Sequence, residues 1–221
     1  MTTPSAETQQ DRRVIMVNTQ LRTGDVVDHE VLEAFLEVPR ERFVSDAFAE
    51  FAYLDRDAPA LGARNRRLLP PLLFARMIQA AAVKAGDKAL DVGGGSGYGA
   101  AILAAMGANV VMLESDASAT ETARRKLAGT GVHVVDGPLD EGAPRFAPFD
   151  VIILEGAFGV LPETLIAQLA DGGRLVGVDR IMGAPQAALF EKRAGALSRR
   201  ALFEAAADVL DSFQPQASFV F

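Results

Sequence analysis

Residues 89–101 read Ala-Leu-Asp-Val-Gly-Gly-Gly-Ser-Gly-Tyr-Gly-Ala-Ala. An apolar run ends at Asp91 and Val92, a glycine-rich turn follows, and an alanine-rich segment comes next. This order predicts a strand, a ligand-binding turn and the start of a helix, which together open a nucleotide-binding α/β sheet. Glycine permits positive φ and close approach of a ligand, and the free N–H groups of the helix start face the turn.

Two ligand classes are compatible with this turn. The spacing of Gly95, Gly97 and Ala100 matches a dinucleotide fingerprint. With Asp91 and Gly93 included, the turn instead resembles the acidic, three-glycine loop of S-adenosylmethionine-dependent methyltransferases. A carboxylate at the strand end would repel a pyrophosphate and attract a cationic amino group or sulfonium. Asp91 therefore favours the methyl donor.

A second acid supports a nucleoside site. Residues 109–114 read as a strand that ends at Glu114, where a carboxylate can accept hydrogen bonds from both ribose hydroxyls in either ligand class. The candidate cofactor-binding residues of these two strand ends are Asp91, Gly93, Gly95, Ser96, Gly97 and Glu114.

Composition limits the alternatives. The chain has 221 residues, 49% of them hydrophobic and 23% charged, as in a globular protein. A net charge of −7 argues against general nucleic-acid binding. The absence of cysteine excludes disulfides and thiolate chemistry. Two isolated histidines give no reason to expect a metal site. With neither a signal-peptide pattern nor a membrane-span pattern, we expect a cytoplasmic location and no membrane partner.

Strand and helix patterns alternate beyond residue 72, which predicts a mostly parallel sheet covered on both faces. We expect a single domain, with residues 1–71 as a helical appendage and substrate-side loop and residues 72–221 as the cofactor-binding core. Residues 1–10 read as a frayed end and residues 55–71 as a long connection. The remaining predicted elements are helices near 14–21, 31–36, 72–83, 117–127 and 162–170, strands at 88–92, 109–114, 132–135, 149–154 and 174–178, and an edge hairpin at 187–203 that residues 218–221 could extend.

The chain resembles the protein-L-isoaspartate O-methyltransferase family from about residue 14 to the hairpin. The matching motifs are Met16-Val17-x-x-Gln20-Leu21, Val31-Leu32, Val38-Pro39-Arg40-x-x-Phe43-Val44, Ala52-Tyr53-x-Asp55, the glycine turn up to Tyr98, Ala147-Pro148-Phe149-Asp150 and Gln168-Leu169-x-x-Gly172-Gly173-Arg174-Leu175-Val176. The resemblance implies a Rossmann-like class I methyltransferase fold with seven strands, S-adenosylmethionine as donor, and esterification of damaged aspartyl carboxylates. It also implies that Asp136 and Gly137 hold the adenine, although Val135 stands where the family has a glycine.

Two departures from the family fall near the expected acceptor. Leu69 aligns with a serine that helps to hold the isoaspartyl group, and leucine offers no hydrogen-bonding group. Glu155, at the end of the fourth core strand, replaces a small apolar residue. If it faces the site, it would repel an acceptor carboxylate or serve as the catalytic base for a hydroxyl or amine. Its other readings are a ligand for the donor's amino group or a helix cap.

Three arginines precede Leu69 in the sequence. Arg64, Arg66 and Arg67 are either solvated loop residues or a substrate-binding clamp for an acidic group. We therefore predict a methyltransferase whose acceptor, a protein, peptide or small molecule, has moved away from isoaspartyl peptides. A catalytically silent nucleoside-binding regulator and a dinucleotide-dependent oxidoreductase are the alternatives, and the oligomeric state stays open.

Overall fold

The computed structural model describes residues 6–181 and 183–214. A seven-stranded sheet in the order β5-β4-β3-β6-β7-β8-β9 forms its centre. Its strands are β3 (Lys88–Val92), β4 (Asn109–Glu114), β5 (His133–Asp136), β6 (Phe149–Phe158), β7 (Leu169–Asp179), β8 (Gln186–Arg193) and β9 (Ala196–Glu204). The first five in this order are parallel, whereas β8 and β9 are antiparallel to their neighbours. This confirms the predicted Rossmann-like sheet with an antiparallel edge hairpin.

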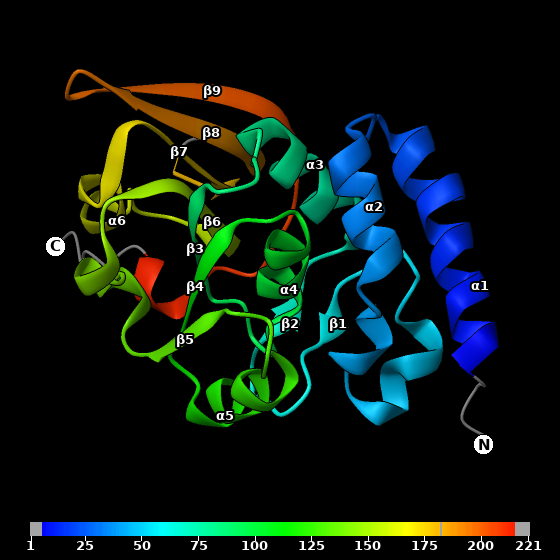
Figure 1. Ribbon diagram of the computed structural model, residues 1–221. Coiled ribbons are helices and arrows are strands. Elements are labelled where there is room, and N and C mark those ends of the chain that lie inside the picture. Colours follow the sequence, from blue (N-terminus) through cyan, green and yellow to red (C-terminus); the bar gives the residue numbers. More distant parts are fainter. Residues whose placement is uncertain (1–5, 182, 215–221) are drawn as a thin grey trace, which may run out of the picture.

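Helices cover both faces of the sheet (Figure 1). They are α1 (Ala6–Met16), α2 (His29–Glu37), α3 (Pro71–Ala81), α4 (Tyr98–Ala105), α5 (Ala117–Lys126) and α6 (Glu163–Ala167). Local sequence explains where they begin: Asp28 and Asp116 cap α2 and α5 through their carboxylates, and α3 starts on a proline. No helix in the described ranges is long and apolar enough to cross a membrane.

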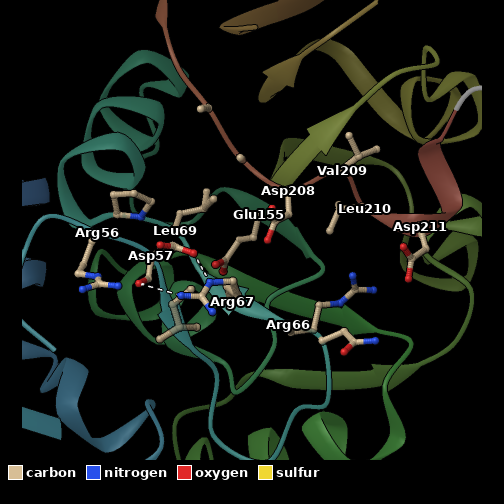
Figure 2. Close-up of a pocket in the computed structure, with 15 residues that line it drawn as sticks. Arg56, Asp57, Arg66, Arg67, Leu69, Glu155, Asp208, Val209, Leu210 and Asp211 are labelled. Atoms are coloured by element: carbon tan, nitrogen blue, oxygen red, sulfur yellow. Dashed lines mark hydrogen bonds and ion pairs between the residues drawn. The ribbon is translucent and has the colours of Figure 1, made fainter. Parts of the chain in front are cut away.

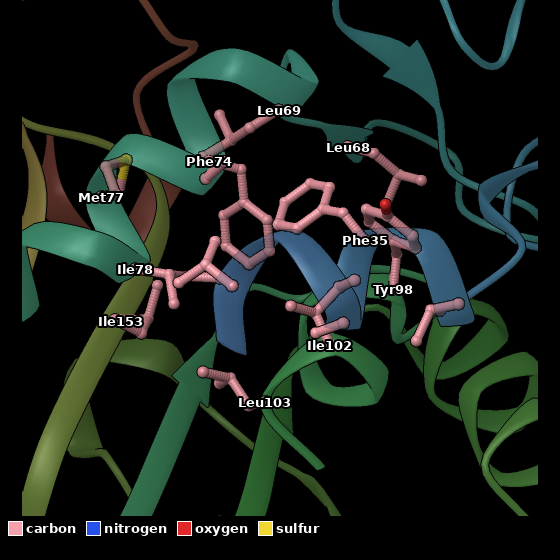
Figure 3. Close-up of a cluster of buried hydrophobic side chains, with 14 of the residues drawn as sticks. Phe35, Leu68, Leu69, Phe74, Met77, Ile78, Tyr98, Ile102, Leu103 and Ile153 are labelled. Carbon is pink, nitrogen blue, oxygen red and sulfur yellow. The ribbon is translucent and has the colours of Figure 1, made fainter. Parts of the chain in front are cut away.

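The N-terminal elements share a core with the sheet. Helix α2 packs on α3 and α4, and Figure 3 shows the aromatic cluster at this junction. The ring of Phe35 lies 6.2 Å from that of Phe74 and 6.1 Å from that of Tyr98, and Tyr98 also contacts Phe43. A second buried cluster covers the opposite face of the sheet, around Leu90 and its neighbours. The appendage is thus packed against the strands that carry the glycine turn.

Several elements differ from the sequence predictions. Helix α1 begins at Ala6, so residues 6–10 are helical rather than frayed. The predicted connection contains a small antiparallel pair, β1 (Ala58–Pro59) with β2 (Arg67–Leu68). Strand β7 starts at Leu169 and includes the residues expected to stop a helix. The prediction for residues 218–221 lies outside the described residues.

After β9 the chain returns across the carboxyl ends of the central strands (Figure 1). We call residues 205–213 the strap. It is held to β6 by two backbone hydrogen bonds, from Ala157 N to the carbonyl of Asp208 and from Leu210 N to the carbonyl of Ala157. Leu210 is 4% exposed and lies over Gly93 and Gly156. The strap thereby forms one wall above the sheet edge where ligands bind in such folds.

Candidate active site

The glycine turn adopts the geometry that its composition predicts. Gly93, Gly95 and Gly97 all have positive φ, and Gly97 leads directly into α4. Asp91 lies in β3 immediately before the turn and is 0% exposed. Ser96 is also buried, and its hydroxyl donates to the carbonyl of Phe43 at 2.5 Å. The serine therefore ties the turn to the N-terminal segment.

Glu114 lies at the end of β4, next to the turn, and is 0% exposed. Its Oε2 accepts a hydrogen bond from Gly95 N at 2.9 Å. Its Oε1 accepts from Ser115 N at 2.7 Å and from Asp116 N at 2.9 Å. The sequence placed this carboxylate beside the turn correctly. Three backbone donors now fix its orientation.

A side chain from the loop between β1 and β2 also donates to Glu114. Arg66 Nε donates to Glu114 Oε1 at 3.1 Å, and its Nη2 donates to Ser115 Oγ at 3.0 Å. The Arg66 side chain is 12% exposed. Sequence reasoning missed this ion pair, because the two residues are 48 positions apart and neither motif refers to the other.

Asp91, near the end of β3, and Glu155 form a buried pair of carboxyl groups on adjacent strands; Glu155 lies within β6 and not at its end as predicted, because β6 continues to Phe158. Burial raises the pKa of Asp91 to about 7, and the charge of Glu114 adds to the effect. Burial and the charge of Asp91 raise the pKa of Glu155 well above its ordinary value. Both shifts disfavour the state in which the two carboxyl groups are ionised together. A Cβ on Gly99 would collide with Glu155 Oε1, so the glycine at the start of α4 makes room for this carboxyl group.

A cavity of about 570 Å³ lies between the β1–β2 loop and the strap, with Glu155 in its lining (Figure 2). We call it the Glu155 cavity. Arg66, Arg67 and Leu69 line it on the loop side, and residues 206–211 line it on the strap side. Arg67 is paired with Asp57. The structure thus brings two of the three predicted arginines and both departures from the family pattern to one cavity.

A second cavity, also about 570 Å³, lies over the end of β4 and the start of α5. We call it the Ser115 cavity. Arg64 lines this cavity and not the first, and its backbone N–H donates to Asp116 at 2.9 Å. Arg66 lines both cavities. The three arginines therefore do not converge on one group.

The predicted adenine-end residues lie beyond Glu114. Asp136 ends β5 opposite Glu114 in the strand register and is exposed. Gly137 N donates to the Glu114 carbonyl at 3.1 Å. A Cβ on Gly137 would meet Leu113 at 3.7 Å, an ordinary contact.

Two further buried residues, Arg40 and Tyr98, were not predicted as site residues. Arg40 is fully buried and donates to the carbonyls of Ala52 and Leu69 at 2.9 and 2.8 Å. Its guanidinium lies 4.9 Å from the ring centroid of Tyr98, the first residue of α4. Arg40 belongs to the motif Val38-Pro39-Arg40 that matches the family, and this match is the signal that could have drawn attention to it. Arg40 sets the position of the Leu69 backbone beneath the Glu155 cavity.

The site fits S-adenosylmethionine in its charges and its turn. Both carboxylate oxygens of Asp91 and Oε1 of Glu155 are buried without a hydrogen-bond partner among the described residues, and a cationic amino group or sulfonium could satisfy them. Glu114 could hold a ribose diol once Arg66 has moved aside. Among the described residues no group of three or more His, Cys, Asp and Glu side chains could hold a metal ion.

Comparison with known proteins agrees with this geometry. Residues 11–205 match the family model for protein-L-isoaspartate(D-aspartate) O-methyltransferase. A protein-L-isoaspartate O-methyltransferase of Methylorubrum extorquens is 44% identical over 168 residues, covering 75% of this chain and 73% of that one. That of Koribacter versatilis is 39% identical over 197 residues, or 86% of each chain.

Solved structures give the same relationship. A protein-L-isoaspartate O-methyltransferase superposes with a TM-score of 0.79 and 27% identity, and the match covers 90% of this chain and 65% of that one. A Plasmodium falciparum structure in complex with S-adenosyl-L-homocysteine has a TM-score of 0.78 over 91% of this chain and 98% of that one; at 19% identity it supports the fold. The chain belongs to the protein-L-isoaspartate(D-aspartate) O-methyltransferase family and is a methyltransferase that depends on S-adenosylmethionine.

Proposed function

We propose that this protein esterifies the carboxyl group of isoaspartyl residues in proteins and peptides. The observation that carries the proposal is the Glu155 cavity, which has arginine on its loop side and reaches the buried Asp91–Glu155 pair beside the glycine turn. The names of the relatives supply the acceptor class, and the cavity supplies a place for it.

On this proposal the donor is held by the residues that the sequence indicated. Asp91 faces the donor's cationic end, Glu114 holds the ribose and Asp136 with Gly137 holds the adenine. The backbone of the turn, from Gly93 and Gly95 through Ser96 and Gly97, supports the methionine portion. When bound, S-adenosylmethionine supplies an electrophilic methyl group on a sulfonium sulfur.

The acceptor needs placement more than activation. A carboxylate is already ionised at neutral pH, so one of its oxygens can form the new O–C bond as the S–C bond breaks, without a base. The chain's task is to aim the carboxylate and exclude water. The strap and the β1–β2 loop form the two walls that would do this.

The raised pKa of Glu155 weakens an objection to a carboxylate acceptor. Two ionised carboxylates 4 Å apart would repel by about 4 kcal/mol at an effective dielectric constant near 20. Burial and the charge of Asp91 raise the pKa of Glu155 well above its ordinary value, which favours its neutral form and so reduces this repulsion.

Leu69 does not supply the hydroxyl that the family uses for its substrate. It is 5% exposed, and its carbonyl is engaged by Arg40. We propose that the guanidinium groups of Arg66 and Arg67 replace that hydroxyl, since arginine binds carboxylates through two parallel hydrogen bonds. The catalytically silent alternative needs Leu69 and the arginines to close the channel, and a cavity of about 570 Å³ in contact with Glu155 argues against closure.

The test is methyl transfer to a matched peptide pair. Purified protein is incubated with methyl-labelled S-adenosylmethionine and a synthetic peptide carrying either isoaspartate or aspartate at one position. We expect base-labile label in the isoaspartyl peptide and background in its twin. Binding of S-adenosyl-L-homocysteine without transfer to the isoaspartyl peptide would refute the acceptor while leaving the donor site intact.

A further inference from the structure

We infer that Arg66 is a gate between the donor and acceptor sites, which leaves Glu114 when the donor binds and then serves the acceptor. The acceptor half of this inference rests on the proposed function, whereas the donor half does not. Arg66 is the residue that contacts the carboxylate at the end of β4 and also lines both cavities.

Hydrogen bonds crowd one oxygen of Glu114. Its Oε1 accepts from Ser115 N, Asp116 N and Arg66 Nε, with Ser115 Oγ at 3.5 Å, whereas its Oε2 accepts from Gly95 N. A carboxylate offers about four acceptor positions, two on each oxygen, so Oε1 is filled and Oε2 keeps a position. The backbone donors belong to the turn and to the chain just after β4, whereas Arg66 belongs to a loop and is the donor that can move. A ribose diol can therefore bond to both oxygens of Glu114 only after Arg66 has left.

The loop that carries Arg66 packs closely on the glycine turn, between the two cavities. Arg66 Cβ would lie 3.5 Å from a Cβ built on Gly95, so the loop rests directly on the glycine turn. Loop residues 60–66 are closed by a hydrogen bond from Ala60 N to the Arg66 carbonyl at 3.0 Å. The Ser115 cavity lies on one side of Arg66 and the Glu155 cavity on the other. When the side chain swings away from Glu114, the two cavities join at the point where donor and acceptor must meet.

The charged side chains that line the Glu155 cavity also support the inference. While Arg66 is paired with Glu114, its charge is neutralised, and Arg67 is likewise paired with Asp57. Asp208 and Asp211 on the strap side have no ion pair with a described residue. Arg56 also lines the cavity; it lies over the ring of Phe48 and has no ion pair with a described residue, so one guanidinium offsets these two acids. Release of Arg66 by the donor adds a second positive charge, so an acidic acceptor binds more tightly after the donor.

Calorimetric titration with S-adenosyl-L-homocysteine tests the donor half. Arg66→Gln removes the competing donor, and we expect it to tighten binding about three- to tenfold, equivalent to about 1 kcal/mol. Arg200→Gln is the control, because it removes one positive charge at an exposed position of β9 that lines neither cavity; it should stay within about twofold of wild type. Equal changes in both variants, or unchanged or weaker binding in Arg66→Gln, would overturn the gate.

Titration with an isoaspartyl peptide tests the acceptor half. In the wild type, saturating S-adenosyl-L-homocysteine should strengthen peptide binding by about fivefold or more, and by linkage the peptide should strengthen nucleoside binding equally. In Arg66→Gln this coupling should fall below about twofold. Coupling of wild-type size in Arg66→Gln contradicts the inference. Peptide binding absent from both proteins refutes the acceptor half and the proposed function, and the nucleoside titration still decides the donor half.

Discussion

Asp91 is a carboxylate that folding removes completely from water. Its pKa is about 7 in the folded protein against an ordinary value of 3.8. Between these two values the folded chain binds more protons than the unfolded chain, so the free energy of unfolding falls as the pH rises from about 4 to 7. Above pH 7 this contribution levels off. This loss of unfolding free energy is the consequence of burying a carboxylate that could bind a cationic ligand.

Asp91→Asn should therefore remove much of that pH dependence. We expect the variant to be more stable than the wild type at pH 8 by about 2–4 kcal/mol, with the difference shrinking toward pH 4. Urea denaturation at pH 5, 6, 7 and 8 measures it. Parallel stability profiles for the two proteins would mean that Asp91 is ionised throughout this range.

The raised pKa of Glu155 has its own consequence for turnover. Glu155→Gln keeps the shape of the neutral carboxyl group that this shift favours, so we expect kcat/KM for an isoaspartyl peptide within about tenfold of wild type, whereas a lost general base costs about 10²- to 10⁴-fold. Initial rates at pH 7 distinguish the two. A loss of a hundredfold or more, with folding intact by circular dichroism, would identify Glu155 as a base.

For some residues of the site the surroundings could be predicted from the sequence, and for others they could not. Asp91 and Glu114 were predictable because each ends a strand at a fixed spacing from a glycine turn, and parallel strands end at one edge. The partner of Glu114 was not predictable. Arg66 meets it through a loop whose path depends on contacts made by Phe43, Asp116 and the turn itself. The environment of Glu155 was equally hidden, since burial favours the neutral form of a carboxyl group that its sequence position suggests is ionised.

At the scale of elements, the strap is the feature that the sequence concealed. Residues 205–213 read Ala-Ala-Ala-Asp-Val-Leu-Asp-Ser-Phe, which has neither the apolar period of a helix nor that of a strand. They pair with β6 through isolated backbone hydrogen bonds. Strands β1 and β2 have two residues each, which is too short for a period-two signal. The long alternating core elements were predicted to within a few residues because their apolar faces recur over several turns or strand positions.

Leu210 anchors the strap, so we expect its truncation to lower the free energy of unfolding. It contacts Gly93 and Gly156 and is 4% exposed, and we expect Leu210→Ala to cost about 2–4 kcal/mol of unfolding free energy. Leu197 in β9 is 38% exposed, and Leu197→Ala should cost about 0.5 kcal/mol or less. Chemical denaturation measures both. Equal losses would show that the strap is not anchored through this side chain.

At the scale of the whole molecule, an N-terminal segment and a C-terminal strap meet over a nucleotide-binding sheet. The aromatic cluster of Phe35, Phe74 and Tyr98 fixes the first to α4, and Leu210 fixes the second to β6. Between them lie the two cavities that Arg66 separates. The family fold thus places Asp91 and Glu114 at one edge of the sheet, and the β1–β2 loop and the strap form the walls of the Glu155 cavity.

A crystal structure of the protein with S-adenosyl-L-homocysteine tests this account most directly. We expect the ribose hydroxyls to donate to Glu114, the amino group of the ligand to lie near Asp91, and the Arg66 guanidinium to point into the Glu155 cavity. A structure in which Arg66 still donates to Glu114 while the nucleoside binds elsewhere would contradict it.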